Sequence, residues 1–245
     1  MNSGTSPTIV LVHGAFADSS HWTRVVQELQ VRDLPVLALA NPLRGLAHDA
    51  AYVASVVDQL DGPVLLVGHS YGGAVISVAA AASDHVVGLV YVAAWILDEG
   101  ESFADVASSF PATPLGAALR PSTYPTPTGT AVELTGAPEH YRAAFAADLS
   151  SADAATAAVG QRPWAAVFED RAAAAAWKSL PAWAVVATAD NAIHPEAQLH
   201  MARRAGAAIV EVDASHSVAL SQPRAVSRLL LDAVERTSTA SAAAS

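Results

Sequence analysis

The sequence predicts an α/β protein with a mostly parallel six-stranded sheet and helices on both faces of that sheet. Short runs rich in Val, Ile and Leu alternate with segments in which apolar residues recur at helical spacing. The runs are apolar at consecutive positions, which is typical of strands that are covered on both faces. The connections are short, and this alternation predicts right-handed crossovers between parallel strands.

Four strands and three helices are expected in the first part of the chain. The strands lie at residues 8–12, 35–40, 63–67 and 86–93, and the helices at residues 20–31, 48–60 and 71–82. The first helix places Trp22, Val25 and Leu29 on one apolar face, and Ser19 or Ser20 is available to cap its N-terminus. Strand and helix therefore follow one another regularly up to about residue 93.

The alternation stops between residues 96 and 177, where Pro, Ala and Thr are abundant and clusters such as RPSTYPTPTG occur. Helical pieces are expected there at residues 139–147, 152–159 and 171–177. The alternation returns with strands at residues 182–188 and 208–212 and helices at residues 195–205 and 223–235. We therefore expect an α/β core of residues 1–95 and 178–238, a helical cap of residues 96–177 inserted after the fourth strand, and a disordered tail of residues 239–245.

Composition and charge narrow the classes of function. The chain has 245 residues, of which 52% are hydrophobic and 15% charged, and its formal net charge of −10 disfavours binding to nucleic acid or anionic lipid. It has no cysteine, and therefore no disulfide and no Cys nucleophile. It shows no secretory signal, and no apolar stretch reaches the roughly 20 residues of a membrane span. We expect a cytoplasmic protein with a small-molecule substrate and without nucleic-acid or membrane partners. The apolar composition permits a homodimer.

A polar Ser stands at the corner between the third predicted strand and the third predicted helix. The stretch Gly68-His69-Ser70-Tyr71-Gly72 fits G-x-S-x-G, in which small residues let strand and helix pass closely while the Ser hydroxyl is lifted clear of the sheet. The alternative interpretation is a Ser that only caps the helix, because G-x-S-x-G alone is a weak pattern. The surrounding motifs favour a nucleophile.

A Ser nucleophile needs a general base, and the base needs a carboxylate that orients it. His216 lies in VDASHSVAL after the last predicted strand, and Asp190 lies in ADNAIHP after the fifth. Both positions are at the C-terminal edge of a parallel sheet, where loops from several strands converge. Asp98, after the fourth predicted strand, is the alternative acid, and Asp213 is too close to His216 along the chain. We expect Ser70, His216 and Asp190 to form a catalytic triad.

Acyl transfer also requires hydrogen-bond donors for the oxyanion. The backbone N–H of Tyr71, at the start of a helix, has no partner within that helix. Gly14 permits an unusual turn that aims the N–H of Ala15 inward, although an ordinary glycine turn at the end of a strand is the alternative. We expect Ala15 and Tyr71 to form the oxyanion hole, and this chemistry needs neither a metal nor an organic cofactor.

These motifs together resemble those of the α/β-hydrolase superfamily. A strand followed by HGAF, the GHSYGG stretch, TADNAIHP and SHSV occur in the family's order of Ser, acid and His. More narrowly, LVHGAFADSSHW and GQRPWAAVF are similar to the plant hydroxynitrile lyases, the related esterases and their bacterial relatives. The resemblance implies an α/β-hydrolase fold with a cap over the site.

Two departures from the lyases bear on the reaction. The lyases of that group carry a Thr where this chain has Gly14 and a Lys where it has Ser217. The Lys supplies positive charge for a leaving cyanide, so the resemblance implies ester hydrolysis rather than cyanohydrin cleavage. Superfamily members with an Asp nucleophile, the dehalogenases and epoxide hydrolases, are disfavoured because residue 70 is Ser.

The sequence thus predicts a carboxylesterase of the serine hydrolase type that acts on a small, largely apolar carboxylic ester. The residues expected to line the substrate pocket are Phe16, Trp95, Phe103, Trp164 and Phe168. Two other classes stay open. One is related triad chemistry, namely a lactonase, perhydrolase, C–C hydrolase or hydroxynitrile lyase. The other is a non-catalytic member of the fold that binds a small ligand, and an intact triad argues against it.

Overall fold

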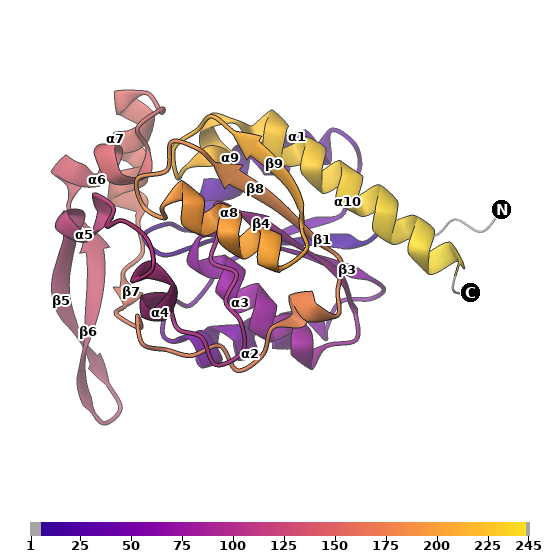
Figure 1. Ribbon diagram of the computed structural model, residues 1–245, viewed down its shortest axis with the longest axis horizontal. Helices are drawn as coiled ribbons and strands as arrows, with labels where there is room; N and C mark the ends of the chain where they lie inside the picture. The colour runs from indigo at the N-terminus through magenta and orange to yellow at the C-terminus, as the bar shows by residue number, and fades with distance from the viewer. Residues whose placement is uncertain (1–5, 244–245) are drawn as a thin grey trace.

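The computed structural model describes residues 6–243, and its centre is a six-stranded sheet in the order β2-β1-β3-β4-β8-β9 (Figure 1). The strands are β1 (Thr8–Val12), β2 (Val36–Leu39), β3 (Val64–His69), β4 (Val86–Val92), β8 (Ala182–Ala187) and β9 (Ala208–Val212). Every adjacent pair runs parallel. The predicted fold class is confirmed, and the strand bounds agree with the prediction to within two residues.

Neighbouring residues of a strand face opposite layers of helices. In β1, Val10 and Val12 pack into one buried cluster, and Ile9 and Leu11 pack into the other. The first layer contains α2 (Leu46–Val57), α3 (Tyr71–Ala79) and α8 (Pro195–Arg204), and the second contains α1 (Thr23–Gln30), α9 (Val218–Ser221) and α10 (Pro223–Ala243) (Figure 1). Because both faces are covered, both alternating sets of strand residues are apolar, and the strands appear in the sequence as continuous apolar runs.

The start of the first helix and the end of the last helix differ from the prediction. The first helix opens with a 3-10 turn, Ser19–Trp22, whose N-cap is Asp18: its carboxylate accepts a hydrogen bond from the N–H of Ser20 at 2.8 Å. Ser19 and Ser20 are therefore not the caps, and the Ser19 hydroxyl donates to a carbonyl of β2 instead. At the other end, α10 continues to Ala243, so residues 239–243, which we expected to be disordered, are helical. Residues 244–245 lie outside the described residues.

Between β4 and β8 the chain leaves the sheet and forms an insertion of helices and strands. Its elements are α4 (Phe103–Ala107), α5 (Leu115–Ala118), β5 (Leu119–Thr126), β6 (Gly129–Gly136), α6 (Pro138–Phe145), α7 (Ser151–Gly160), β7 (Trp164–Ala165) and a 3-10 turn, Ala176–Lys178. A further 3-10 turn, Ala80–Ala82, follows α3 in the core. The strands β5, β6 and β7 form a separate antiparallel sheet.

The insertion thus contains the helices expected of a helical cap and, in addition, a small sheet that the sequence did not predict. The helices predicted at residues 139–147 and 152–159 are present as α6 and α7, but residues 171–177 form no α-helix. Arg171 instead makes an isolated antiparallel bridge with Ser102, which ties the two ends of the insertion together. The residue boundaries between core and cap stay a prediction.

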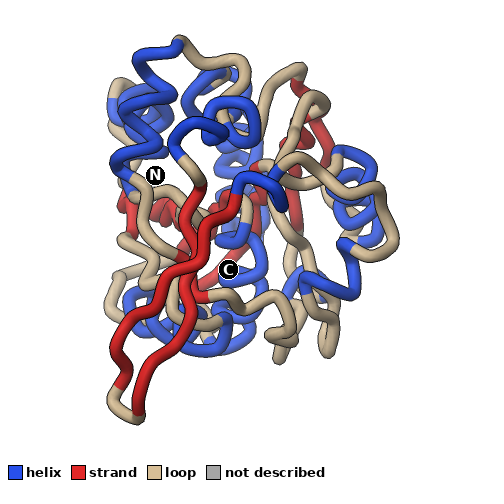
Figure 2. Tube along the Cα trace, turned by 90° about the vertical axis from the view of Figure 1, so that its left-hand side faces the viewer, coloured by secondary structure: helices blue, strands red, loops and turns tan. Residues whose placement is uncertain are grey.

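The β5–β6 hairpin projects from the body of the molecule (Figure 2). Within the described sheet β5 pairs with β6 alone, and Pro121 and Pro125 on β5 have no N–H to donate. A strand with two prolines is compatible with this place because one edge of β5 makes no ladder bonds. Arg44 of the core contacts both strands of the hairpin. Its Nη1 lies 2.7 Å from Glu133 Oε2 of β6, and its guanidinium carbon lies 4.3 Å from the centre of the Tyr124 ring of β5.

Within residues 6–243, no helix is long and apolar enough to cross a membrane. The same residues contain no group of three or more His, Cys, Asp or Glu side chains arranged to hold a metal ion. The cytoplasmic location, the homodimer and the absence of nucleic-acid and membrane partners stay predictions.

Candidate active site

Ser70 is the single residue between β3 and α3. Its backbone has φ 54° and ψ −123°, a conformation that residues with a side chain rarely adopt and that costs about 1–3 kcal/mol. Hydrogen bonds hold the turn on both sides: the Ser70 N–H donates to the Val92 carbonyl at 3.2 Å, and the Ser70 carbonyl accepts from the N–H groups of Gly73 at 3.0 Å and Trp95 at 3.1 Å. The core therefore fixes the strained turn that a nucleophile at this position requires.

The glycines around Ser70 are required by the close approach of backbone segments. A Cβ atom on Gly68 would lie 2.5 Å from the carbonyl oxygen of Gly72, and a Cβ atom on Gly72 would lie 2.4 Å from the carbonyl oxygen of Val12. A Cβ atom on Gly14 would lie 2.5 Å from Ser70 Cβ and 3.1 Å from Ser70 Oγ. The G-x-S-x-G pattern is thus a steric requirement here, and the loop after β1 passes directly against the Ser70 side chain.

His216 and Asp190 lie in the loops that follow β9 and β8, and both are buried. His216 Nδ1 lies 2.7 Å from Asp190 Oδ2. Because a carboxylate only accepts hydrogen bonds, we assign the proton to Nδ1 and the lone pair to Nε2. In the described structure Nε2 is buried and makes no hydrogen bond. This imidazole is therefore arranged to take a proton, and it lines the same cavity as Ser70.

The Asp190 carboxylate is oriented by further donors. Its Oδ1 accepts from the N–H groups of Ala192 at 2.6 Å and Ile193 at 3.0 Å, and its Oδ2 accepts from Gln198 Nε2 at 2.7 Å as well as from His216. Gln198 lies on α8 and is buried. Sequence reasoning missed Gln198, because nothing in the pattern of an amphipathic helix separates a buried Gln from an exposed one.

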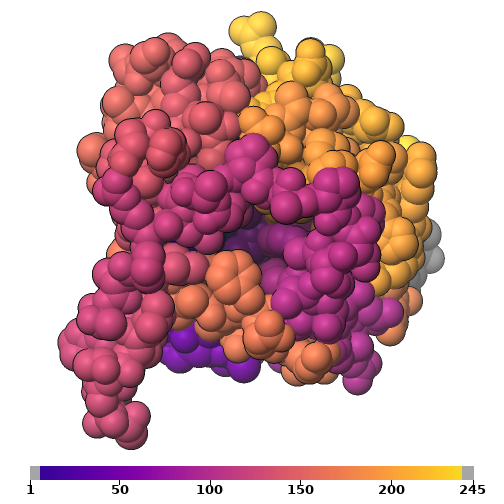
Figure 3. All heavy atoms as spheres, turned by 60° about the vertical axis from the view of Figure 1, so that its left-hand side comes forward, coloured from indigo at the N-terminus to yellow at the C-terminus, as the bar shows by residue number. Residues whose placement is uncertain are grey.

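The cavity over Ser70 is small and aromatic, with a volume of about 50 Å³. All five residues expected in the substrate pocket line it: Phe16, Trp95, Phe103, Trp164 and Phe168. The lining residues that the sequence did not single out are Leu115, Leu119, Phe145, Ala192 and Ile193. On this side of the molecule, Figure 3 shows a hollow with indigo and purple residues of the N-terminal half at its floor and residues of the insertion around its rim. Phe145 belongs to a predicted helix, but helical spacing alone could not show that its ring faces the cavity over Ser70.

Ala15 and Tyr71, the expected oxyanion donors, both line this cavity. Tyr71 is the first residue of α3, so its N–H has no carbonyl partner within the helix. Its hydroxyl donates to the buried carboxylate of Asp49 at 2.8 Å, and burial together with that negative charge raises the pKa of Tyr71. The Tyr71 side chain is therefore a neutral anchor, and its backbone N–H is the group suited to an oxyanion.

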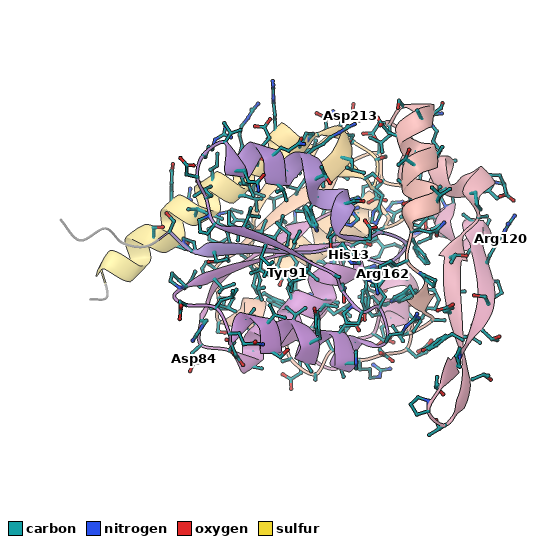
Figure 4. The ribbon with its side chains drawn as sticks, turned by 180° about the vertical axis from the view of Figure 1, so that it is seen from behind. His13, Asp84, Tyr91, Arg120, Arg162 and Asp213 are labelled. Atoms are coloured by element: carbon teal, nitrogen blue, oxygen red, sulfur yellow. The ribbon has the colours of Figure 1, made fainter. Side chains whose placement is uncertain are left out.

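The two other carboxylates considered from the sequence lie elsewhere. Asp98 forms an ion pair with Lys178, and this hydrogen bond holds the pKa of Asp98 below its usual value. Asp213 is exposed at the surface of the molecule (Figure 4). Asp190 is the carboxylate that bonds to His216, so the geometry favours it over Asp98 as the acid.

A cluster of buried histidines supports the base from the core, and sequence reasoning did not assign it. His69 Nε2 donates to the backbone carbonyl of His216 at 2.9 Å, and the His69 ring lies between those of His21 and His216, at centroid distances of 4.1 and 4.7 Å. His13 lies in the interior at the end of β1 (Figure 4). Burial lowers the pKa of His13 to about 4 and that of His21 to about 3, and it lowers the pKa of His69 well below its usual value. These three rings are therefore neutral at pH 7.

Comparison with known proteins agrees with this architecture. The chain is 31% identical over 117 residues to lipase LipV of Mycobacterium tuberculosis (strain ATCC 25618 / H37Rv), a match that covers 43% of this chain and 44% of that protein. The matched part thus spans less than half the length of this curated relative.

Solved structures share the fold over nearly the whole chain. Polyneuridine aldehyde esterase superposes with a TM-score of 0.81 at 23% identity, covering 93% of this chain and 98% of that one. The methylesterase MES16 from Arabidopsis superposes with a TM-score of 0.75 at 20% identity, covering 94% of this chain and 99% of that one. At these identities the likeness is one of fold. The model of the alpha/beta hydrolase family matches residues 9–229, and the chain therefore belongs to that family.

Proposed function

We propose that this protein is a carboxylesterase that hydrolyses a small, largely apolar carboxylic ester through an acyl-enzyme on Ser70. The observation that carries the proposal is that Ser70, on its strained turn, and His216, which bonds to Asp190, line one aromatic cavity. The lipase and esterase names of the similar proteins support the same class of reaction.

Acylation uses each group in one role. Ser70 Oγ attacks the ester carbonyl while His216 Nε2 takes its proton, and Asp190 stabilises the imidazolium that forms. The N–H groups of Ala15 and Tyr71 bind the oxyanion of the tetrahedral intermediate. Loss of one such donor typically removes roughly 3–4 kcal/mol of transition-state stabilisation.

Acylation ends when the alcohol leaves with the proton held on His216 Nε2. In the second half of the reaction, a water molecule gives a proton to the same nitrogen as it attacks the acyl carbonyl. The second tetrahedral intermediate releases the carboxylic acid and restores Ser70 Oγ–H. Apart from the ester and this water molecule, all the groups that react belong to the chain.

The cavity supports the proposed substrate class. The described residues that line it include no Lys, Arg, Asp or Glu, and most of them are aromatic or aliphatic. A volume of about 50 Å³ is well below the roughly 300–1,000 Å³ of pockets for drug-sized ligands. A short acyl or alcohol group without charge fits these walls best.

The structure gives a physical reason to disfavour the hydroxynitrile lyase alternative. A Cβ atom at Gly14 would lie 2.5 Å from Ser70 Cβ, so this loop has no room for the Thr of those lyases. Ser217 is buried, its N–H donates to the Phe145 carbonyl at 2.9 Å, and its side chain carries no positive charge for a cyanide ion. Lactonase, perhydrolase and C–C hydrolase chemistry would use the same groups, and a panel of substrates distinguishes them.

The test is steady-state hydrolysis of a panel of short-chain esters, lactones and amides by the wild-type protein and by Ser70→Ala. We expect turnover of small apolar esters, and a fall in kcat of about 10⁶ in Ser70→Ala, as in measured triads. Cyanide release from mandelonitrile serves as the lyase control and should be negligible. A Ser70→Ala variant that keeps a tenth of the wild-type turnover would remove Ser70 from the mechanism.

A further inference from the structure

The loop that carries His216 is held from two sides. From the core, His69 Nε2 donates to the His216 carbonyl at 2.9 Å. From the insertion, the C-terminal end of α6 and the residues that follow it bond to Ser215 and Ser217, the two residues that flank the base. The core contact and the Phe145 contact are buried, whereas the contact of Asp148 with the Ser215 N–H is partly exposed.

Asp148 makes the main side-chain contact on the insertion side. Its Oδ2 accepts from the Ser215 N–H at 3.1 Å, and its Oδ1 accepts from the Ser215 hydroxyl. The Phe145 carbonyl accepts from the Ser217 N–H at 2.9 Å, and its oxygen lies 3.2 Å from the Ser215 hydroxyl oxygen, whose one proton is given to Asp148. Two residues three positions apart in the insertion thus bind the backbone on both sides of His216.

The same segment also touches the substrate cavity and the loop of the acid. The Phe145 ring lines the cavity, and its centroid lies 5.8 Å from that of His216 and 5.4 Å from that of Phe16. The Ala143 carbonyl accepts from Asn191 Nδ2 at 2.9 Å, one residue after Asp190. Any shift of this segment therefore reaches the base, the acid and the cavity wall together.

We propose that Asp148 is a positioning residue that holds His216 in line with Ser70, so that correct seating of the insertion and alignment of the base are coupled. The inference rests on the proposed function, in which His216 takes the Ser70 proton. A base displaced by about 1 Å can cost up to roughly 100-fold in rate, and this is the size of effect that a clamp on its backbone can control.

The test compares Asp148→Ala, Asp148→Asn and Ser215→Ala with a matched control, Asp153→Asn. Asp153 is another partly exposed carboxylate of the insertion, but its partner is Arg24, at 3.1 Å. For each variant kcat and KM are measured on the best ester, together with thermal stability and the rate at which a fluorophosphonate probe labels Ser70.

In Asp148→Ala we expect kcat and the labelling rate to fall by roughly 10- to 100-fold, with KM and the melting temperature near wild type. Asp148→Asn keeps one acceptor oxygen and should recover part of the loss. Ser215→Ala should lower kcat less than Asp148→Ala, because the Ser215 N–H can still reach Asp148. Asp153→Asn should behave as wild type.

Three results would overturn the inference while the proposed function stands, provided that the wild type is active and Ser70→Ala is not. They are a wild-type kcat in Asp148→Ala, a change in KM alone, and an equal loss of kcat in Asp153→Asn. A wild-type protein that hydrolyses no ester and whose Ser70 is not labelled would instead overturn the proposed function, and the inference with it.

Discussion

Ser70 and Phe145 line the same cavity, but the core and the insertion hold them in different ways. Around Ser70 backbone meets backbone, and an added Cβ atom on Gly68 or Gly72 would come within 2.5 Å of a carbonyl oxygen. Phe145 is held by side chains: its ring stacks on Tyr141 at 4.9 Å and meets Phe16 edge-on at 5.4 Å. Side-chain packing accommodates substitutions that backbone contacts do not. We therefore expect the core to fix the proposed chemistry, and substitutions in the insertion to change the range of substrates.

The largest difference in kcat should appear between two carboxylate variants, Asp190→Asn and Asp98→Asn. Asp190→Asn should lower kcat by about 10⁴, because an Asn amide favours the wrong tautomer of His216. Asp98, which pairs with Lys178 near the start of the insertion, is the matched control, and Asp98→Asn should keep wild-type kcat. Steady-state kinetics of both variants decide between the two acids. A large loss in Asp98→Asn with little loss in Asp190→Asn would reverse the assignment.

The same difference between the core and the insertion should appear in the stability of two glycine variants. Gly72→Ala places a Cβ atom 2.4 Å from the Val12 carbonyl oxygen, so the free energy of unfolding should fall by roughly 1–3 kcal/mol or more. Gly116, in α5 of the insertion, has nothing within 4 Å of its Cβ position. Gly116→Ala should leave stability unchanged or raise it by up to about 1 kcal/mol. Urea denaturation measures both, and equal effects would show that the two regions do not differ in this way.

A third difference between the two regions concerns the buried histidines of the core and acid pH. Burial lowers the pKa of His21 to about 3, whereas the unfolded chain takes up that proton below about pH 6.5. The stability that neutral His21 contributes is therefore complete above pH 6.5 and is lost as the pH falls toward 3. In His21→Phe the slope of unfolding free energy against pH, between pH 6 and pH 4, should decrease by about 1.4 kcal/mol per pH unit.

His140→Gln serves as the control for that experiment, because His140 lies exposed on α6 of the insertion. Its slope should match that of the wild type. An unchanged slope in His21→Phe would mean that this ring is not buried in its neutral form.

Much of the core could be predicted because short stretches of its sequence determine its strands and the turn at Ser70. Strands covered on both faces are continuous apolar runs, so residues 8–12 and 208–212 were predicted with the bounds of β1 and β9. Parallel strands end at one edge of the sheet, and this rule brought His216 and Asp190 together from distant segments. The spacing of Gly68 and Gly72 around Ser70 could be read from the sequence, and the close approach of backbone segments at both glycines explains it.

The strands of the insertion were not predicted, for physical reasons. Pro121 and Pro125 make β5 resemble a loop, and an edge strand with both faces largely exposed has no apolar alternation to reveal it. The roles of Gln198, His69 and Asp148 depend on contacts between segments that only the fold brings together. His69 and His216, for example, are 147 positions apart in the chain.

Covalent labelling shows whether Ser70 is a nucleophile that His216 activates. The folded wild-type protein is treated with a fluorophosphonate probe, and the labelled residue is identified by peptide mass spectrometry. We expect a single label on Ser70 that disappears in Ser70→Ala and forms far more slowly in His216→Ala. A label on any other residue, or labelling of His216→Ala at the wild-type rate, would contradict the account.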